Sequence, residues 1–415
     1  MNITKMKMAL PLVAAMLAFG GTATVNSASA VTITIDKVQQ RFPWNGLVDI
    51  DYTITPGNGE TIDEETMIDF YAIECDSTPW YTNDVNTIIQ SEVNCAAGSH
   101  RVTWNANADG VNGKFRQMRF GVRLCTKPNR YMIIDVSGGA SAETFPITYV
   151  DNPPSGGFNV DEYKGDKIVL RRIEPGTYTQ GSPIDEIGRT AASEMQHQIK
   201  FEEAFYIGIF EITQKQYNNV MGTGGGNYQP IGQMSWETIR GSSTTHNWPT
   251  VTTVDGTKFM GKLRAKAGLD FDLPTEFQWE YACRAGTTSM YNNGASCTTA
   301  EEIAAALTDI AVYKGTASSV ANVGSHSPNA WGLYDMHGNH WEWCLNWYAD
   351  DWYTTVGSPT EPVVNPTGPM SGTNRAGRGG SYSDDAAAIR SALRSNVAPN
   401  KSYTALGFRL YSPKP

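Results

Sequence analysis

The chain has 415 residues, of which 40% are hydrophobic and 18% charged, so it carries enough apolar material for ordinary cores. A chain of this length predicts two or three domains rather than one core. The net charge of −10, without blocks of lysine or arginine, argues against nucleic acid or an anionic membrane as partner. An acidic balance suits an exported or cation-binding protein, although plain solubility explains it as well.

The first 30 residues have the pattern of a secretory signal peptide. Lys5 and Lys7 form a basic start, Met8 to Phe19 are apolar, and Ala28-Ser29-Ala30 offers a cleavage site between small residues. The apolar stretch is too short to cross a membrane and no stop-transfer segment follows it, so we expect no membrane insertion. The sequence therefore predicts a secreted or periplasmic protein, cleaved near Ala30.

Export changes the interpretation of the six cysteines, because disulfides persist outside the cytoplasm. No two of them form a CxxC pair, which argues against zinc. We expect structural bridges and take Cys75–Cys95 and Cys283–Cys297 as candidate pairs, although connectivity cannot be read from a sequence.

Residues 31–150 predict an all-β domain. Several short segments alternate apolar and polar residues, as half-buried strands do, between Gly, Asn and Pro turns. These segments are Val31–Ile35, Leu47–Ile54, Met67–Ile73, Phe120–Leu124 and Tyr131–Ile134. Short strands at this spacing favour a small β-sandwich. We find no catalytic cluster in it and expect a binding or spacer module.

Residues 151–157, with the sequence DNPPSGG, break the pattern and predict a linker. The following domain, 158–415, predicts an α+β fold with few, short helices. Thr213 with Gln216, and Thr275 with Gln278, form capping boxes that start two helices. A third amphipathic segment begins near Asp255. The many aromatic residues must supply the core.

The second domain contains four characteristic motifs. They read IGIFEITQ at 207–214, LPTEFQWEYACRAG at 273–286, PNAWGLYDMHGNHWEW at 328–343, and RGGSY at 378–382 followed by RSALR at 390–394 and GFR at 407–409. In this order and spacing they resemble the motifs of the sulfatase-modifying-factor (formylglycine-generating enzyme) family. The resemblance implies a C-type-lectin-like fold with little regular secondary structure.

The active oxidases of that family convert a cysteine of client sulfatases to formylglycine, with copper(I) held by two cysteines after the GGS motif. Here Asp384 stands where the first cysteine would be, and the shortened stretch between Ser381 and Arg394 leaves no position for the second. Copper(I) prefers soft thiolates to a hard carboxylate. Cys344 is the nearest cysteine in sequence, and one thiol cannot replace a pair. The sequence therefore argues against copper.

Two other metals deserve comparison. His337, His340 and Glu342 could suit iron, but they lie within a tight Gly-Asn loop, which favours structural roles. Calcium fits the resemblance better, because the family wraps it with the equivalents of the Asp335 side chain, the Gly338 and His340 carbonyls and the Glu342 side chain. Oxygen ligands from one short loop suit this hard cation. The alternative is that both carboxylates only accept hydrogen bonds from loop amides.

The resemblance also implies a ligand groove. Its equivalents here are Trp341, Ser381, Asp384, Arg390 and Arg394. The two arginines could equally be structural ion-pair partners. Asp384 and Asp385 would favour a cationic or hydroxyl-rich ligand over an acidic one.

We therefore expect a non-oxidase family member that binds a protein or glycan partner through its lectin-like domain. The alternative is an enzyme, either a formylglycine-generating oxidase acting on sulfatase cysteines or another metal-dependent oxidase. A diversified receptor ranks last, because the C-terminal segment lacks the asparagine richness of such proteins.

Overall fold

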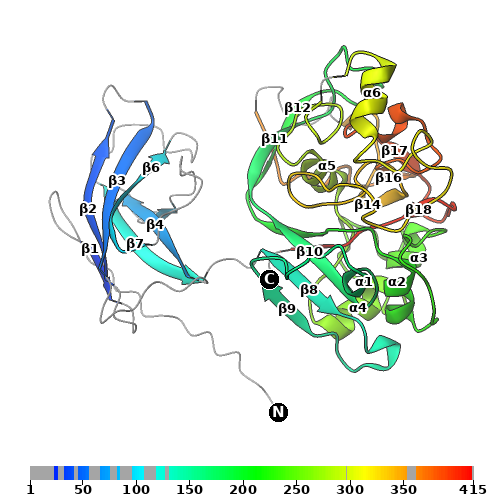
Figure 1. The fold of residues 1–415 in the computed structure, drawn as a ribbon, viewed down its shortest axis with the longest axis horizontal. Helices are drawn as coiled ribbons and strands as arrows, with labels where there is room; N and C mark the ends of the chain where they lie inside the picture. Colours follow the sequence, from blue (N-terminus) through cyan, green and yellow to red (C-terminus); the bar gives the residue numbers. More distant parts are fainter. Residues whose placement is uncertain are drawn as a thin grey trace. The chain divides into compact units, whose positions relative to one another are not determined.

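The computed structural model describes residues 23–26, 32–41, 45–55, 66–74, 82–84, 96–106, 118–126, 130–295, 297–352 and 361–413. The chain divides into two compact units, residues 1–128 and 129–415 (Figure 1). Among the described residues, no helix has both the length and the apolar character needed to cross a bilayer.

In the first unit, the described strands form two antiparallel sheets. The strand order of one sheet is β1 (Ala23–Asn26), β2 (Thr32–Gln40), β3 (Leu47–Thr55) and β6 (Gly98–Asn105). The order of the other is β5 (Thr82–Asp84), β4 (Thr66–Glu74) and β7 (Met118–Thr126). Alternate residues of β3 are buried, as its sequence pattern predicts.

Aromatic side chains join these two sheets. The Tyr52 and Phe70 rings, from β3 and β4, lie 5.2 Å apart between centroids, and Trp104 and Phe120, from β6 and β7, lie 6.0 Å apart. The apolar faces of the two sheets therefore contact one another. Cys75 and Cys95, a candidate disulfide pair, fall outside the described residues.

In the second unit, the largest sheet is antiparallel and five-stranded. Its strand order is β19 (Tyr411–Pro413), β13 (Phe205–Gly208), β10 (Lys167–Ile173), β8 (Tyr131–Asp135) and β9 (Ile147–Val150). Both faces of β8 are covered, because Met132 and Ile134 pack into one cluster of buried residues and Tyr131 and Ile133 into another.

The position of β8 and β9 corrects the expected domain boundary. Both strands precede the expected linker at 151–157, yet both pair within the sheet of the second unit. The division lies between 128 and 129 instead. An apolar strand pattern predicts that a segment forms a strand but not which sheet it joins, so the sequence alone predicts a boundary that lies too late in the chain.

Two smaller sheets and several short helices complete an α+β unit. The strand order of the three-stranded sheet is β11 (Gly176–Gln180), β12 (His197–Phe201) and β15 (Val363–Val364). The order of the four-stranded sheet is β17 (Ser395–Val397), β16 (Arg375–Arg378), β14 (Trp341–Trp347) and β18 (Leu406–Gly407). The helices are α1 (Asp161–Gly165), α2 (Gln214–Met221), α3 (Trp236–Arg240), α4 (Phe259–Ala267), α5 (Glu276–Arg284) and α6 (Ala300–Leu307), with 3-10 turns η1 (Gly139–Ser141) and η2 (Ala386–Ile389).

Local sequence signals explain where these helices start and stop. The Thr213 and Thr275 capping boxes are both confirmed, and each satisfies two backbone N–H groups at the start of α2 and α5. A third box, at Thr299, starts α6. The segment expected from Asp255 becomes helical at Phe259, and a left-handed Gly268 ends it.

The candidate disulfide between Cys283 and Cys297 is wrong. Both are free thiols, as is Cys344. Cys283 lies on α5 inside the main core, whereas Cys297 packs beside α6 in a separate cluster with residues such as Ile303. Each thiol is therefore used as a small apolar group.

Candidate functional site

The loop of residues 335–342, which leads into β14, is held in a tight backbone conformation. Asp335, Gly338 and Asn339 all have positive φ angles, of 57°, 95° and 58°. A side chain at position 338 would meet the Val312 carbonyl at 2.0 Å, so only glycine fits. The Gly338 N–H donates to the carbonyl of Gly379 at 2.8 Å, which joins the loop to the RGGSY motif.

Three buried carboxylates lie in this loop or beside it. Glu342 accepts hydrogen bonds from the Arg409 guanidinium at 2.7 and 2.6 Å and from the Trp279 indole N–H at 2.7 Å. Glu211, from the segment before α2, accepts from the His340 backbone N–H at 2.9 Å. Asp335 accepts through Oδ2 from the Gly324 N–H at 2.7 Å. A backbone amide of the loop thus engages Glu211, and one from outside the loop engages Asp335.

The negative charges of these three carboxylates would favour a bound cation. Asp335 Oδ1 is buried and has no hydrogen-bond partner. Burial raises the pKa of Asp335 to about 6, and the nearby Glu342 adds to the rise although Arg409 opposes it. Burial, Asp335 and Glu342 also raise the pKa of Glu211. Like charges at close range disfavour ionisation, and a bound cation would relieve this.

The types of ligand atoms near this loop bear on which metal could bind there. Within the described part of the chain, no group of three or more His, Cys, Asp and Glu side chains could hold a metal ion. Backbone carbonyl oxygens beside a carboxylate are ligands that suit calcium better than zinc or iron.

The histidines of the loop are not assembled for iron. The Asn292 N–H donates to His337 Nε2 at 3.1 Å, so Nδ1 carries the proton and donates to the Ile389 carbonyl at 2.7 Å. Burial lowers the pKa of His337 to about 4, so the ring is neutral at pH 7. Glu342 already accepts two hydrogen bonds from the Arg409 guanidinium. The structural interpretation of His337 is therefore the one that the contacts support.

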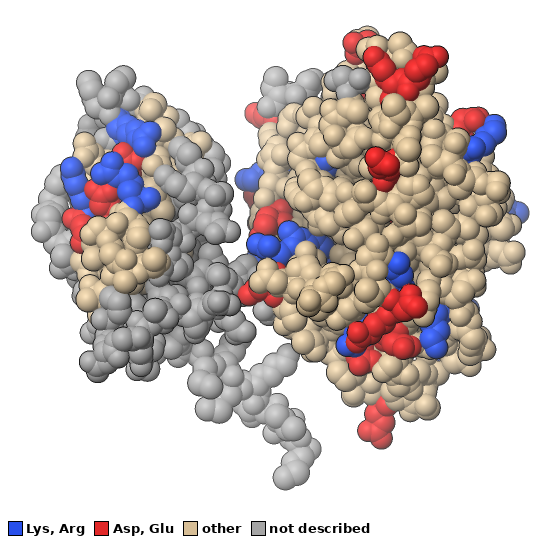
Figure 2. All heavy atoms as spheres, in the orientation of Figure 1, with Lys and Arg blue, Asp and Glu red and all other residues tan. Residues whose placement is uncertain are grey.

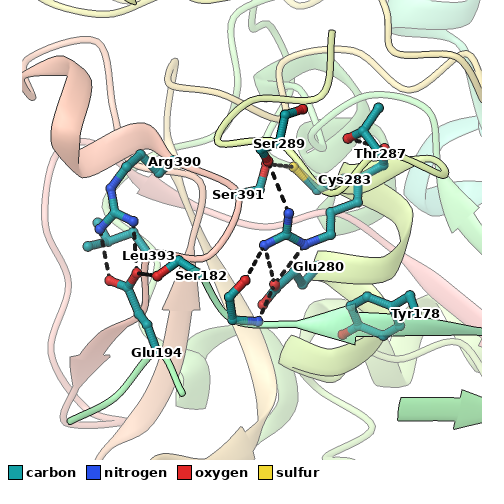
Figure 3. A network of polar contacts seen from close by, with 12 residues as sticks. Tyr178, Ser182, Glu194, Glu280, Cys283, Thr287, Ser289, Arg390, Ser391 and Leu393 are labelled. Atoms are coloured by element: carbon teal, nitrogen blue, oxygen red, sulfur yellow. Dashed lines mark hydrogen bonds and ion pairs between the residues drawn. The ribbon is translucent and has the colours of Figure 1, made fainter. Parts of the chain in front are cut away.

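Cys283 lies beside His337 but is not an activated nucleophile. Its sulfur is 3.9 Å from His337 Nε2, whose lone pair already accepts from the Asn292 N–H. The sulfur is also 3.8 Å from the Ser391 hydroxyl (Figure 3). Burial raises the pKa of the Cys283 thiol to about 12. A thiolate is the reactive form, so this environment suppresses reactivity.

Asp384 forms one cluster with two of the other expected groove residues, Ser381 and Trp341. Its Oδ2 accepts from the Ser381 hydroxyl at 2.5 Å, from the Ser381 N–H at 3.0 Å and from the Trp341 indole N–H at 2.8 Å. Asp384 thereby closes the turn after RGGSY against β14. Its neighbour Asp385 is exposed and pairs with Lys314 at 3.0 Å.

The other two expected groove residues are buried in ion pairs. Arg390 donates to Glu194 through two nitrogens, each at 2.8 Å (Figure 3). It also donates to Glu186 at 2.6 Å. Arg394 donates to Glu276 at 2.6 and 2.8 Å. Of the two roles considered for these arginines, the contacts are those of structural partners.

A further ion-pair network lies beside them. Glu280 accepts from the Arg284 guanidinium and from the Gly181 N–H, and the Gly181 carbonyl accepts from Arg284 (Figure 3). Glu280 also accepts from Arg378 at 2.8 Å. Sequence reasoning missed these acids, although a signal was present. Glu276 and Glu280 stand one turn apart on a helix whose other residues are mostly apolar, so both had to be buried and paired.

The visible face of the second unit is more acidic than basic at two places. Figure 2 shows acidic side chains gathered over α1 and over α6. The exposed residues there are Asp161, Glu162 and Asp166, and Glu301 and Glu302. Ligands of positive or neutral charge are favoured on such a surface.

These features define an α+β domain whose motifs are joined through buried arginine–carboxylate pairs. Arg409 of GFR pairs with Glu342 of GNHWEW, and Arg378 of RGGSY pairs with Glu276 and Glu280 of the 273–286 motif. Residues 161–413 match the family described as the sulfatase-modifying factor enzyme 1-like domain. This match spans more than half of the chain, and the protein therefore belongs to that family.

The relatives match over part of their length. The formylglycine-generating enzymes of Bos taurus and Thermomonospora curvata are each 34% identical over 150 residues, or 33% of this chain and 37% and 48% of theirs. The serine/threonine-protein kinase pkn1 of Chlamydia pneumoniae is 36% identical over 138 residues, 33% of this chain and 20% of its own. The chain thus spans less than half of the length of these relatives.

Solved structures resemble the chain at lower identity. Treponema denticola variable protein 1 has a TM-score of 0.46 and 23% identity, covering 60% of this chain and 96% of its own. PvdO from Pseudomonas aeruginosa has a TM-score of 0.46 and 20% identity, covering 59% and 94%.

Proposed function

We propose that the protein is an exported, non-oxidase member of its family that binds a protein or glycan partner through its second unit. The observation that carries this proposal is the role of Asp384. This carboxylate stands where the resemblance places a copper-binding cysteine. It accepts hydrogen bonds from Ser381 and Trp341 instead. The residue that would begin the metal site instead closes the turn.

The thiols support the same conclusion. Cys283 and Cys344 are both buried, and burial raises the pKa of Cys344 well above its usual value. Copper(I) needs a pair of accessible thiolates, and these two are neutral core residues. An oxidase of altered design would have to use some other group.

The test is a formylglycine assay on the purified mature protein. We expect no conversion of a sulfatase-type cysteine peptide with copper(I) supplied, while the Thermomonospora curvata enzyme, run in parallel, converts it. Mass spectrometry detects the lighter aldehyde directly. Copper-dependent turnover that survives Cys344→Ser would overturn the proposal. Turnover lost in that variant would also overturn it and would place the metal at Cys344.

Calcium is the metal we propose for the 335–342 loop. Its ligands would be the Asp335 side chain, the carbonyls of Gly338 and His340, and the Glu342 side chain. The unpartnered Oδ1 of Asp335 supports this choice. Because Glu342 is also paired with Arg409, we expect Asp335 to be the side chain on which binding depends most.

Calcium should therefore raise the melting temperature of the second unit. Binding to the folded state alone stabilises it by about 2.7 kcal/mol at a hundredfold excess over Kd. Asp335→Ser should abolish that increment, whereas Asp385→Asn, which removes an exposed acid elsewhere, should keep it. Identical melting curves with calcium and with chelator in the wild type would rule the site out.

We further propose that the second unit has the C-type-lectin-like arrangement and that the first unit is a β-sandwich that serves as a spacer or binding module. The ring contacts of Tyr52 with Phe70 and of Trp104 with Phe120 support a sandwich. The groove would lie at Trp341, Ser381 and Asp384, and the acidic surface favours a cationic or hydroxyl-rich partner.

A further inference from the structure

The outer strand of the first unit comes from the segment that we expect to be removed on export. Among the described residues, β1 is an edge of the sheet β1-β2-β3-β6 (Figure 1). It pairs with the start of β2 in antiparallel register, with Ala23 opposite Ile35 and Asn26 opposite Thr32. Residues 23–26 also lie within the predicted signal peptide, upstream of Ala30.

Cleavage near Ala30 would therefore take β1 away and leave β2 at the edge. The backbone N–H and C=O groups of Thr32–Ile35 that pair with β1 would lose these β1 partners. An unpaired edge is a template for another strand. This step rests on the export part of the proposed function and on nothing in the second unit.

The open stretch is short and has a defined end. The β2–β3 register shifts between Ile35 and Lys37, and the β1 pairing stops at Ile35. At the shift, the exposed Asp36 accepts a hydrogen bond from the Thr53 hydroxyl at 2.6 Å. A bulge and a lysine are devices that protect sheet edges from pairing. These two features protect the edge beyond Ile35, and among the described residues neither of them occurs within Thr32–Ile35.

The four open positions also specify the chemistry of an incoming strand. Ile33 and Ile35 are buried, with 0% and 4% exposure, whereas Thr32 and Thr34 are half-buried. Cross-strand neighbours share a face, so residues opposite the two isoleucines meet the core side and residues opposite the threonines meet the polar side. The sequence of β1, Ala-Thr-Val-Asn, meets this requirement at its register positions.

We propose that Thr32–Ile35 of the mature protein is a strand-accepting site. It binds a short extended segment of a partner protein, antiparallel to β2, uncharged, with apolar residues opposite Ile33 and Ile35. Main-chain hydrogen bonds supply the attraction, and the alternation of side chains supplies the selectivity. In the precursor, residues 23–26 occupy the site, so that it opens only after cleavage.

The test compares a chain that starts at Val31 with one that starts at Gly21 and retains β1. The probe is the synthetic peptide of residues 21–28. We expect saturable binding to the shorter chain and loss of binding to the longer one. Hydrogen exchange should slow on peptide addition within 32–35 and stay unchanged beyond Lys37. No binding to the Val31 chain, or protection elsewhere, would overturn the proposal.

Two further measurements keep the outcome decisive. Peptides with Thr24→Pro or Val25→Pro serve as matched controls, because alternate residues of an edge strand donate to the neighbouring strand. One of the two should lose binding more than the other, and equal binding by both would contradict strand pairing. N-terminal sequencing of the exported protein tests the premise separately. A product that keeps residues 23–26 would overturn the site in the native protein without bearing on the second unit.

Discussion

At the scale of single residues, Arg375 shows how the second unit buries a charge without a carboxylate. Its guanidinium carbon lies 3.4 Å from the centre of the Trp347 ring and 4.1 Å from that of Trp236. Two carbonyl oxygens, of Trp248 and Leu345, accept from it at 2.9 Å. Burial, reinforced by Arg240, lowers the pKa of Arg375 to about 9. Only a flat cation meets two rings and two carbonyls at once.

Arg375→Lys should therefore be costly despite keeping the charge. An ammonium cannot cover both rings, and its compact, hydrated charge would remain buried among poorly matched acceptors. We expect a loss of about 2–3 kcal/mol in the free energy of unfolding, measured by urea denaturation. Arg130→Lys, at an exposed arginine of the same unit, is the control and should change stability little. A similar small change in Arg375→Lys would show that the rings add nothing.

The residues of the candidate site could be predicted only where the signal was local. The motif segments around Asp335 and Ser381 identified the loops that meet, because both lie in contiguous sequence. The partners of Arg390 could not be predicted, since Glu194 is 196 positions away along the chain. No spacing rule connects such a pair, and only the fold brings it together.

At the scale of elements, the segment between β11 and β12 illustrates how a long loop is fixed. Glu194 accepts from two nitrogens of Arg390, from the Ser182 hydroxyl at 2.7 Å and from the Thr190 N–H at 3.2 Å. The loop carries Ile184, which is 88% exposed, so apolar burial contributes little there. The buried ion pair must therefore hold the loop.

Glu194→Gln tests this role with little change of shape. The amide cannot neutralise the buried Arg390, and breaking a buried pair by removing one charge costs about 3–5 kcal/mol. We expect the free energy of unfolding to fall by an amount near the lower value, because Glu186 still faces Arg390. We also expect faster proteolysis between residues 183 and 193. Glu202→Gln, in an exposed pair with Lys200, is the matched control and should cost less than about 1 kcal/mol. An unchanged cleavage pattern would argue that other contacts order the loop.

Helix positions and sheet membership differ in how far sequence determines them. The capping boxes of α2 and α5 were predictable because the residues involved are three positions apart. The strand character of β8 was predictable from its apolar run, but its partner β10 begins more than thirty residues later. A strand's neighbours depend on contacts across the whole unit, so the local sequence pattern does not predict which strands will pair.

At the scale of the whole molecule, the division into units follows from the position of β8. This strand lies between β10 and β9 in the five-stranded sheet, with core residues on both of its faces. The family match begins at 161 and so leaves β8 and β9 outside. Yet β8 covers one edge of β10, and its Met132 and Ile134 are fully buried. The folding unit is therefore larger than the matched region.

Two shortened chains should reveal this difference. A chain from Asn129 to the C-terminus keeps the whole sheet and should show one cooperative calorimetric transition, at the temperature at which the second unit melts in the full chain. A chain from Phe158 lacks β8 and β9, so β10 would expose an unpaired edge and the apolar side chains of Ile168 and Leu170. We expect it to aggregate or to melt without a cooperative transition.

A point substitution separates the loss of core packing from an effect of truncation. Met132→Ala in the full chain should destabilise the second unit by about 2–5 kcal/mol, the usual cost of removing a buried Met side chain. The transition of the first unit should not move, because Met132 packs into a core of the second unit. If the Phe158 chain melted like the Asn129 chain and Met132→Ala left the second transition in place, β8 would be dispensable and the boundary would belong at 151–157 after all.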